Sequence, residues 1–424
     1  MKKKILGVFA IIIVTFSNLS AQETVKVMFY NLLNYPSENS VPNRIDDLSY
    51  ILSDYHPDLF LVCELNNING AIEVLNATKS AIDSNFEMAT YVPNTSDDSS
   101  WNQNNLQNLL YYNSAKFSLE EEIIVPTDLR DFNVYHIKLN TENQTTNPIE
   151  FYIIICHLKA SDGTSNTQKR FEMVEDLEHY LDTLPNDSNI LLGGDLNVYT
   201  SSETAFQKLL SINNNISFVD PANRVGSWHN NTSYADVFTQ STRAQTGFGG
   251  AAGGFDDRFD FILTSENMMD TADITYVTDS YQAYGNNGLA SCWNKAINSL
   301  DCETIGSQFS YELRNALHNF SDHLPVTLSL ETDATFLDIE EFQQLSGMRL
   351  EVTTVKQNLV VNIDSVDLYN QRLTIYNNLG QRIKSFQMNS DAKQYFNVSD
   401  LQQGLYFLSV SNKNSNPTKF IISN

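Results

Sequence analysis

Short apolar runs, many of them followed directly by a polar residue, recur along the first three quarters of this chain. Runs of this length are typical of buried strands, because a buried helix would need a longer apolar segment. The predicted strands lie at residues 25–30, 59–63, 109–112, 132–137, 151–156, 189–192, 258–263 and 324–330.

Two segments show a different period, with apolar residues three or four positions apart. They predict amphipathic helices over residues 44–55 and 168–184. Strands that alternate with helices in this way favour a mixed α/β domain. The apolar positions are Ile45, Leu48, Leu52 and Tyr55 in the first helix and Phe171, Val174, Leu177 and Leu181 in the second.

The pattern changes again towards the C-terminal end. Residues 334–346 are acidic and show no strong periodicity, so we expect a linker there. Residues 347–424 are predicted to form a small all-β sandwich that carries no candidate chemistry. Their β-like runs, separated by turns that contain Asn or Gly, lie at 359–363, 373–376, 405–410 and 420–422.

Residues 1–21 have the features of a signal peptide. Three lysines precede an apolar run over residues 5–16, and Ala21-Gln22 offers a cleavage point. The run is too short for a normal membrane span. We therefore expect an exported, soluble mature protein with no stable membrane insertion.

The net charge is strongly negative and unevenly distributed. The whole chain carries −25, whereas residues 22–346 carry −31, from 15 basic and 46 acidic residues. Such a surface repels polyanions at long range, so a nucleic-acid substrate would need divalent cations, local arginines or high salt.

The four cysteines are compatible with disulfides in an exported protein. Cys292 and Cys302 are close in sequence and lie in a loop-like stretch, which favours a bridge between them. Cys63 and Cys156 end apolar runs, where reduced core residues are as plausible as a bridge.

Polar side chains stand at the ends of most of the predicted strands. Each has a structural alternative: an Asx turn for aspartate or asparagine, a satisfied core position for histidine, a salt bridge for glutamate. Chance explains one such residue more easily than a whole series in one domain. The series is Asn31, Glu64, His157, Asp195, Asn197, Asp260, Asp322 and His323.

Part of this series suits a divalent metal. Glu64, with Asn31 and Asp322 beside it, offers the hard oxygen ligands that Mg²⁺ or Mn²⁺ prefers. A metal held there would act as a Lewis acid on a phosphoryl oxygen.

The remaining residues suit hydrolysis of a phosphate ester. Asp195 can activate the attacking water, while Asn197 and His157 stabilise the negative charge that develops on the phosphate. His323, oriented by Asp260, can transfer a proton or polarise the phosphate. No serine, cysteine or lysine nucleophile is implied, so we expect attack by water in one step.

Two further features have open interpretations. Arg130 is either a solvated surface arginine or, in a chain poor in arginine, a contact for the substrate phosphate. The glycine run at residues 247–254 only loosely resembles a phosphate-binding loop, because it lacks the P-loop lysine and follows no clear strand. We expect a flexible loop there.

In combination, these motifs resemble the endonuclease/exonuclease/phosphatase superfamily over residues 24–332. The resemblance implies a deoxyribonuclease I-like four-layered α/β sandwich, with residues 22–333 as the catalytic domain and the roles given above at the matching positions. It implies Mg²⁺ or Mn²⁺ as cofactor, with structural Ca²⁺ as a further option. The matching elements are Asn31, Leu61-Val-Cys-Glu64, His157-Leu-Lys159, Gly193-Gly-Asp195-Leu-Asn197, Arg258-Phe-Asp260 and Ser321-Asp-His323.

The chain departs from the better-defined branches of that superfamily. Deoxyribonucleases pair a glutamate with the histidine that matches His157, but residues 101–110 offer only amides such as Gln107 and Asn108. The arginine expected shortly after the metal-binding glutamate is also missing, since Leu65 follows Glu64.

The C-terminal segments 373–382 and 397–408 resemble the type IX secretion sorting domain of Bacteroidetes. The resemblance implies an address that the type IX secretion machinery recognises and removes, and hence secretion to the medium or cell surface. The alternative is a β-sandwich that binds carbohydrate or protein.

Three functions are compatible with these observations. The first is a secreted metal-dependent phosphodiesterase, an endonuclease that degrades extracellular nucleic acid. The second keeps the chemistry but acts on a phospholipid, as sphingomyelinases do, or on a small phosphate ester, which an acidic surface tolerates better. The third is a non-catalytic secreted binding protein, although a binding scaffold has no need of both Asp195 and His323.

Overall fold

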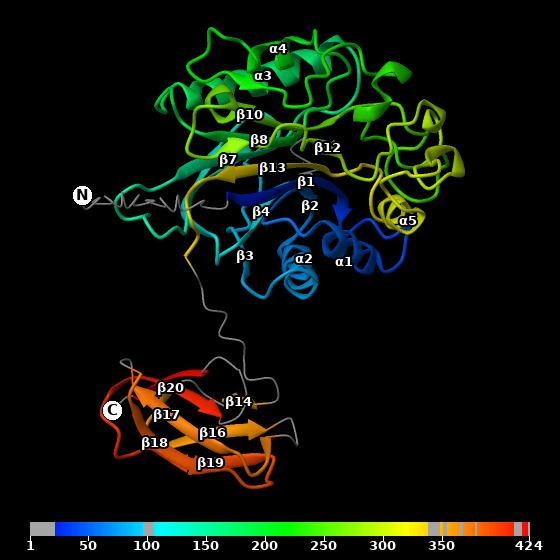
Figure 1. The fold of residues 1–424 in the computed structure, drawn as a ribbon. Helices are drawn as coiled ribbons and strands as arrows, with labels where there is room; N and C mark the ends of the chain where they lie inside the picture. Colours follow the sequence, from blue (N-terminus) through cyan, green and yellow to red (C-terminus); the bar gives the residue numbers. More distant parts are fainter. Residues whose placement is uncertain are drawn as a thin grey trace, which may run out of the picture. The chain divides into compact units, whose positions relative to one another are not determined.

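The computed structural model describes residues 22–95, 106–337, 348–350, 354–363, 368–377, 380–410 and 418–422. The chain divides into two compact units, Met1–Leu337 and Asp338–Asn424 (Figure 1). The predicted signal peptide lies outside the described residues, as do residues 338–346 of the predicted linker.

Two β-sheets pack face to face in the first unit, because β1 and β2 of one sheet contact β7, β8 and β10 of the other. The first sheet has the order β11 (Thr275–Tyr276), β13 (Val326–Thr332), β1 (Glu23–Tyr35), β2 (Leu59–Leu65), β4 (Gln107–Asn113) and β3 (Phe86–Met88), and β12 (Gln282–Ala283) also pairs with β13. The second has the order β5 (Phe117–Val125), β6 (Phe132–Leu139), β7 (Glu150–His157), β8 (Ile190–Asp195), β10 (Asp260–Ser265) and β9 (Phe218–Val219).

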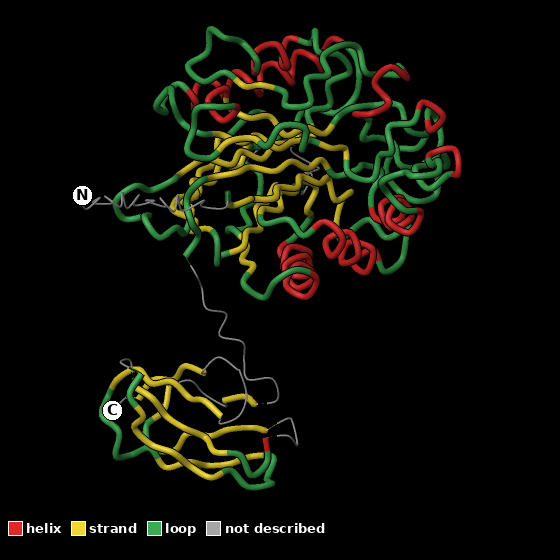
Figure 2. Tube along the Cα trace, in the orientation of Figure 1, coloured by secondary structure: helices red, strands yellow, loops and turns green. Residues whose placement is uncertain are grey.

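Helices cover the outer faces of both sheets (Figures 1 and 2). The first sheet is covered by α1 (Arg44–Tyr55) and α2 (Ile68–Ala81), with α5 (Tyr311–Phe320) beside α1. The second is covered by α3 (Thr164–Leu181) and α4 (Thr204–Leu209). Among the described residues, short 3₁₀ helices lie in the connections at Thr232–Val237, Glu266–Met269, Ala290–Cys292 and Leu300–Cys302. The predicted four-layered α/β sandwich is thereby confirmed.

The apolar runs form these strands because both faces of the central strands are covered. Every residue of β2 is buried, with a helix on one side and the second sheet on the other. The sheets lie close together at Gly193 of β8, where a Cβ atom would lie 2.7 Å from the Leu61 side chain and 3.3 Å from the Phe29 side chain. Glycine at this position therefore lets the two sheets meet just before the strand reaches Asp195.

The second unit is a β-sandwich, as predicted, and its apolar core lies between two sheets. The first sheet has the order β14 (Met348–Leu350), β16 (Asn358–Ile363) and β19 (Lys393–Asn397). The second has the order β15 (Thr354–Val355), β21 (Thr418–Ile422), β20 (Gly404–Val410), β17 (Arg372–Asn377) and β18 (Arg382–Gln387).

Cys292 and Cys302 form the predicted disulfide. Cys63 and Cys156 are free and buried, so the reduced-core alternative holds for this pair. No helix in the described part of the chain is long and apolar enough to cross a membrane.

Glu178 is an acidic side chain buried between α3 and α4. It is 4% exposed, and Lys208 Nζ lies 3.9 Å from its Oε2. Its Oε1 has no hydrogen-bond partner among the residues that the structure describes. Burial raises the pKa of Glu178 to about 7. A carboxyl whose folded pKa exceeds its unfolded pKa costs stability once the pH rises above the folded value.

We therefore predict that Glu178→Gln raises the free energy of unfolding at about pH 8 by roughly 1–3 kcal/mol, with the gain vanishing near pH 4.5. Urea unfolding of the full chain at several pH values measures this difference. Glu175→Gln, an exposed change on the same helix, is the matched control and should have little effect. An equal loss of stability at both pH values in Glu178→Gln would contradict the prediction.

Candidate active site

The strand register brings the predicted polar residues together at one end of the two sheets. In the first sheet β1 and β2 run parallel with Asn31 opposite Cys63, which places Asn31 beside Glu64. In the second sheet Asp195 of β8 lies between His157 of β7 and Asp260 of β10. Because the two sheets face each other, all these side chains enter one shared region.

The amide of Asn31 links carboxylates from both sheets. Its Nδ2 donates to Glu64 Oε1 at 2.9 Å and to Asp195 Oδ2 at 3.1 Å, while its Oδ1 accepts from the Leu33 backbone N–H. The second oxygen of Glu64 accepts from Asn34 N at 2.9 Å. Asn31 is fully buried, so these bonds are formed without competition from water.

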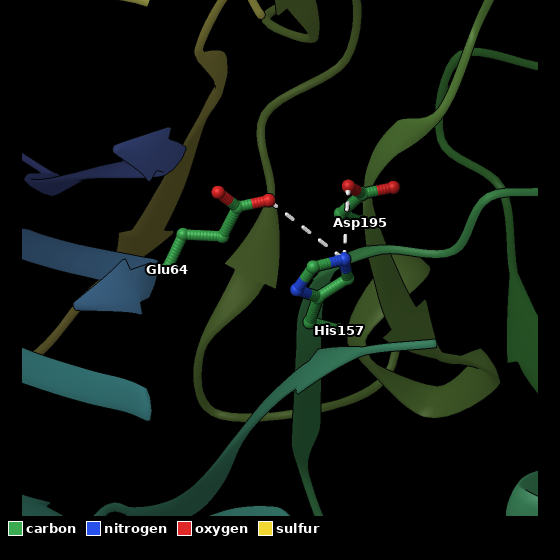
Figure 3. Close-up of side chains that lie close together, drawn as sticks. All are labelled: Glu64, His157 and Asp195. Carbon is green, nitrogen blue, oxygen red and sulfur yellow. Dashed lines mark ion pairs between the residues drawn. The ribbon is translucent and has the colours of Figure 1, made fainter. Parts of the chain in front are cut away.

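His157 faces the same two carboxylates. Its Nε2 lies 3.6 Å from Asp195 Oδ2 and 3.9 Å from Glu64 Oε1 (Figure 3). Within the described residues its Nδ1 has no hydrogen-bond partner. Burial lowers the pKa of His157 well below its usual range, and the nearby Arg130 charge lowers it further. The imidazole is therefore neutral at neutral pH.

His323 has the opposite charge state. Its Nδ1 lies 2.7 Å from Asp260 Oδ2, and its Nε2 lies 3.8 Å from Asp195 Oδ2. Burial lowers the pKa of His323, but the charges of Asp260, Asp322 and Asp195 outweigh this and hold it well above its usual range. One histidine of the site is thus cationic and the other neutral.

The carboxylates of the site are close enough to repel one another. Burial raises the pKa of Asp195 to about 8, and although the His323 charge acts against this, Asp260 and Glu64 add to it. Burial also raises the pKa of Glu64, and the neighbouring Asp322 charge raises it further. A buried excess of carboxylates calls for cationic partners beyond His323.

A divalent cation fits this arrangement. Two groups, Glu64–His157–Asp195 and Asp195–Asp260–His323, hold potential ligand atoms within 4.8 Å of one another. In the described part of the chain, Oδ1 of Asp322 and Oδ1 of Asp260 are buried without hydrogen-bond partners. Hard carboxylate and amide oxygens are the ligands that Mg²⁺ or Mn²⁺ prefers.

Asn197 lies in the loop directly after β8. Its backbone is in the left-handed region, with φ of 52°, and its N–H donates to Asp195 Oδ1 at 3.1 Å. The side-chain Nδ2 donates to the Leu158 carbonyl at 3.4 Å. The backbone of Asn197 thus contacts Asp195, and its carboxamide contacts the residue after β7; its role in stabilising charge on the phosphate stays a prediction.

The interpretation of Arg130 as a solvated surface arginine is wrong. The residue is 4% exposed, and it donates from Nε to the His157 carbonyl at 2.8 Å and from Nη2 to the Leu158 carbonyl at 2.6 Å. These carbonyls follow the end of a buried strand and need donors. Arg130 thus fixes the backbone that carries His157, and its contact with a substrate phosphate stays a prediction.

Sequence reasoning missed Gln240. Its Nε2 lies 2.5 Å from His323 Nε2 and 3.3 Å from Asp322 Oδ2. The residue comes from a segment whose irregular pattern gave no signal, and isolated bridges pair it with both Asp257 and His323. Asn108 does not replace the missing glutamate, because His157 Nδ1 has no hydrogen-bond partner among the described residues. The Asn108 Nδ2 donates to the backbone carbonyls of Asp131 and Ile155 and to the Asn133 side chain.

The fold is that of the deoxyribonuclease I-like class of proteins. Residues 28–323 match the model of the Endonuclease/Exonuclease/phosphatase family, and the chain belongs to that family. Its members are hydrolases that depend on a divalent metal and act on phosphate esters. Residues 355–424 match the Secretion system C-terminal sorting domain, which indicates type IX secretion to the cell surface or extracellular space.

Solved structures with a similar fold have low sequence identity to this chain. The human Nocturnin catalytic domain with bound sulfate is 14% identical, and the match covers 73% of this chain and 97% of that chain with a TM-score of 0.44. TDP2 from D. rerio complexed with single-strand DNA product is 16% identical, and the match covers 73% of this chain and 99% of that chain with a TM-score of 0.46. A mannosyl-6-phosphatase from Bacteroides thetaiotaomicron is 16% identical, and the match covers 72% of this chain and 99% of that chain with a TM-score of 0.43. The search of curated proteins gave no match.

We predict that Asp260→Asn lowers the pKa of His323, because it removes the carboxylate that lies 2.7 Å from Nδ1. An NMR titration of histidine-labelled protein measures this pKa directly. Asp257→Asn is the matched control, since Asp257 lies 2.7 Å from a different histidine, His229, and the change should move the pKa of His323 much less. An unchanged pKa of His323 in Asp260→Asn would show that the contact with Asp260 does not determine the charge of His323.

Proposed function

We propose that this protein is a secreted phosphodiesterase that cleaves extracellular nucleic acid as an endonuclease, by attack of water assisted by Mg²⁺ or Mn²⁺. The observation that carries the proposal is the buried group joined by Asn31, in which a neutral His157 and a cationic His323 lie beside Asp195. A binding scaffold gains nothing from burying these groups together, whereas hydrolysis of a phosphodiester uses each of them.

The proposed metal ligands are Glu64, Asn31 and Asp322. Glu64 and Asp322 are close enough for the charge of one to raise the pKa of the other. A bound Mg²⁺ or Mn²⁺ would supply Lewis-acid polarisation of the phosphate. Asn31 holds Glu64 in place through its amide N–H, which leaves little freedom for that carboxylate to turn away.

Asp195 is the proposed general base. It accepts hydrogen bonds from Asn31 Nδ2 and Asn197 N, and as a carboxylate it would take the proton from the attacking water. Neutral His157 and the carboxamide of Asn197 would contact the phosphate oxygens. His323, protonated and held by Asp260, donates a proton or a hydrogen bond to the phosphoryl group.

The acidic surface favours a second candidate. With −31 on residues 22–346, a phospholipid headgroup or a small phosphate ester meets less long-range repulsion than a polyanion. The proposed chemistry is the same for these substrates, so assays on several substrates are needed to decide between them.

We predict that the mature chain from Gln22 nicks plasmid DNA with Mg²⁺ and that EDTA abolishes the activity. Asp195→Ala and His323→Ala should each lower the rate by about 10²–10⁴-fold, because each removes a group that transfers a proton or stabilises charge. Glu175→Gln, an exposed change on α3, is the control and should act like wild type.

RNA and sphingomyelin vesicles are tested in parallel. Release of phosphocholine without cleavage of DNA would support phospholipid hydrolysis, the second candidate function, and contradict the nuclease function. Metal-dependent hydrolysis that survives both alanine substitutions would show that the catalytic assignment is wrong.

We further propose that the sorting domain is removed during export. Mass spectrometry of the protein from culture medium should then find a C-terminus near residue 345. An intact tail on the exported protein would contradict this proposal.

A further inference from the structure

The glycine-rich loop at residues 247–254 packs directly on the carboxylate of Asp322. Gly250 has φ of +62°, and a Cβ atom at this position would lie 2.5 Å from both Cγ and Oδ2 of Asp322. The same atom would lie 2.8 Å from the Leu33 side chain. Only a residue without a side chain lets the backbone approach the carboxylate this closely.

The loop holds one oxygen of Asp322 and leaves the other free. Ala251 N donates to Oδ2 at 2.6 Å, and Gln240 Nε2 lies 3.3 Å from the same oxygen. Oδ1 has no hydrogen-bond partner in the part of the chain that the structure describes, although Asp322 is only 4% exposed. A buried carboxylate oxygen without a donor is suited to bind a cation.

A buried arginine anchors the loop to the segment that carries Asp322. Arg243 is fully buried and donates from Nη1 to the carbonyls of Phe248 and Gly249, each at 2.8 Å. Its Nε and Nη2 donate to the carbonyls of His318 and Asn319 at 3.0 and 2.9 Å, in the last turn of α5. This turn leads within three residues to Asp322.

The base of the loop is closed by two more hydrogen bonds. Gly254 N donates to the Arg243 carbonyl at 3.0 Å, and Ser241 Oγ donates to the Ala251 carbonyl at 2.9 Å. The position of the Ala251 N–H relative to Asp322 is therefore fixed from both ends of the loop.

We propose that the 247–254 loop is a positioning element for a metal ligand: it fixes Oδ2 of Asp322 and leaves Oδ1 available to the divalent cation proposed above. This inference rests on the metal-dependent function proposed above. Gly250 and Arg243 are positioning residues, since they act through Asp322 and touch neither metal nor substrate. Hydrogen bonds that orient a metal-binding carboxylate typically account for about 10–100-fold in metal affinity.

The loop offers a matched control at Gly253. Its φ is +127°, so alanine there is also strained, but a Cβ atom would meet nothing within 4 Å. A change in metal binding caused by Gly250→Ala and not by Gly253→Ala therefore reports the crowding at Gly250, where the added Cβ would meet Asp322 and Leu33, whereas general stiffening of the loop would affect both variants.

The test is the affinity of the full chain for Mn²⁺ alone, measured by isothermal titration calorimetry or electron paramagnetic resonance without substrate. Gly250→Ala should weaken Mn²⁺ binding by about 10–100-fold, and Gly253→Ala should stay within about 2-fold of wild type. Ser241→Ala, a milder change that frees the Ala251 carbonyl, should weaken binding by about 3–10-fold and serves if Gly250→Ala fails to fold.

Asp322→Asn separates this inference from the proposed metal site. If Asp322→Asn binds Mn²⁺ like wild type, Asp322 is not a ligand, and both the site assignment and the loop's role are wrong. If Asp322→Asn loses binding while Gly250→Ala and Ser241→Ala retain it, the metal site stands and the inference about the loop alone is overturned. Equal weakening in Gly250→Ala and Gly253→Ala would also overturn it.

Discussion

The hydrogen bonds of one buried amide hold the candidate site together. Asn31 Nδ2 donates to Glu64 on its own sheet and to Asp195 on the facing sheet, so a single group sets the distance between carboxylates that the sequence separates widely. This contact requires the two sheets to lie very close, and Gly193 permits that approach where any side chain would collide with Leu61. The site is therefore a consequence of how the sheets pack, and the helices outside serve to keep them together.

Charge is the second constraint, and it follows from burial. Glu64, Asp195, Asp260 and Asp322 are nearly inaccessible to solvent, and their mutual repulsion and desolvation disfavour ionisation of Asp195 and Glu64. The charges of Asp260 and Asp322 hold the pKa of His323 well above its usual range, whereas burial holds the pKa of His157 well below it. Two residues of one type thus acquire different chemistry from their surroundings.

Most of the fold could be predicted because its strands are buried on both faces and appear as plain apolar runs. The same logic located the polar residues that end those runs, for example Glu64 after Leu59–Cys63 and Asp195 after the run that begins at residue 189. Prediction from apolar runs failed for residues in irregular segments that are distant in sequence from the strands they contact. Gln240 and the loop around Gly250 lie in a stretch without periodicity, and only the tertiary structure places them on Asp322 and His323.

The burial of Arg130 was also not predictable from the sequence. An arginine between two strands gives no sign that it will be buried, and only the carbonyls of His157 and Leu158 explain its position. The C-terminal unit was easier to predict, since alternating strands and turns with no candidate chemistry suffice for a β-sandwich. Its function as a sorting domain came from resemblance and from the family match, because nothing in its packing reveals an address for secretion.

A crystal structure of the protein grown with Mn²⁺, with anomalous diffraction recorded, tests the proposed metal site most directly. We predict an anomalous peak within about 2.0–2.3 Å of a carboxylate oxygen of Glu64 and of Oδ1 of Asp322. A peak found only at the partly exposed group His229, Asp256 and Asp257, or none among the residues joined by Asn31, would contradict the proposal that this buried cluster is a metal-dependent hydrolytic site.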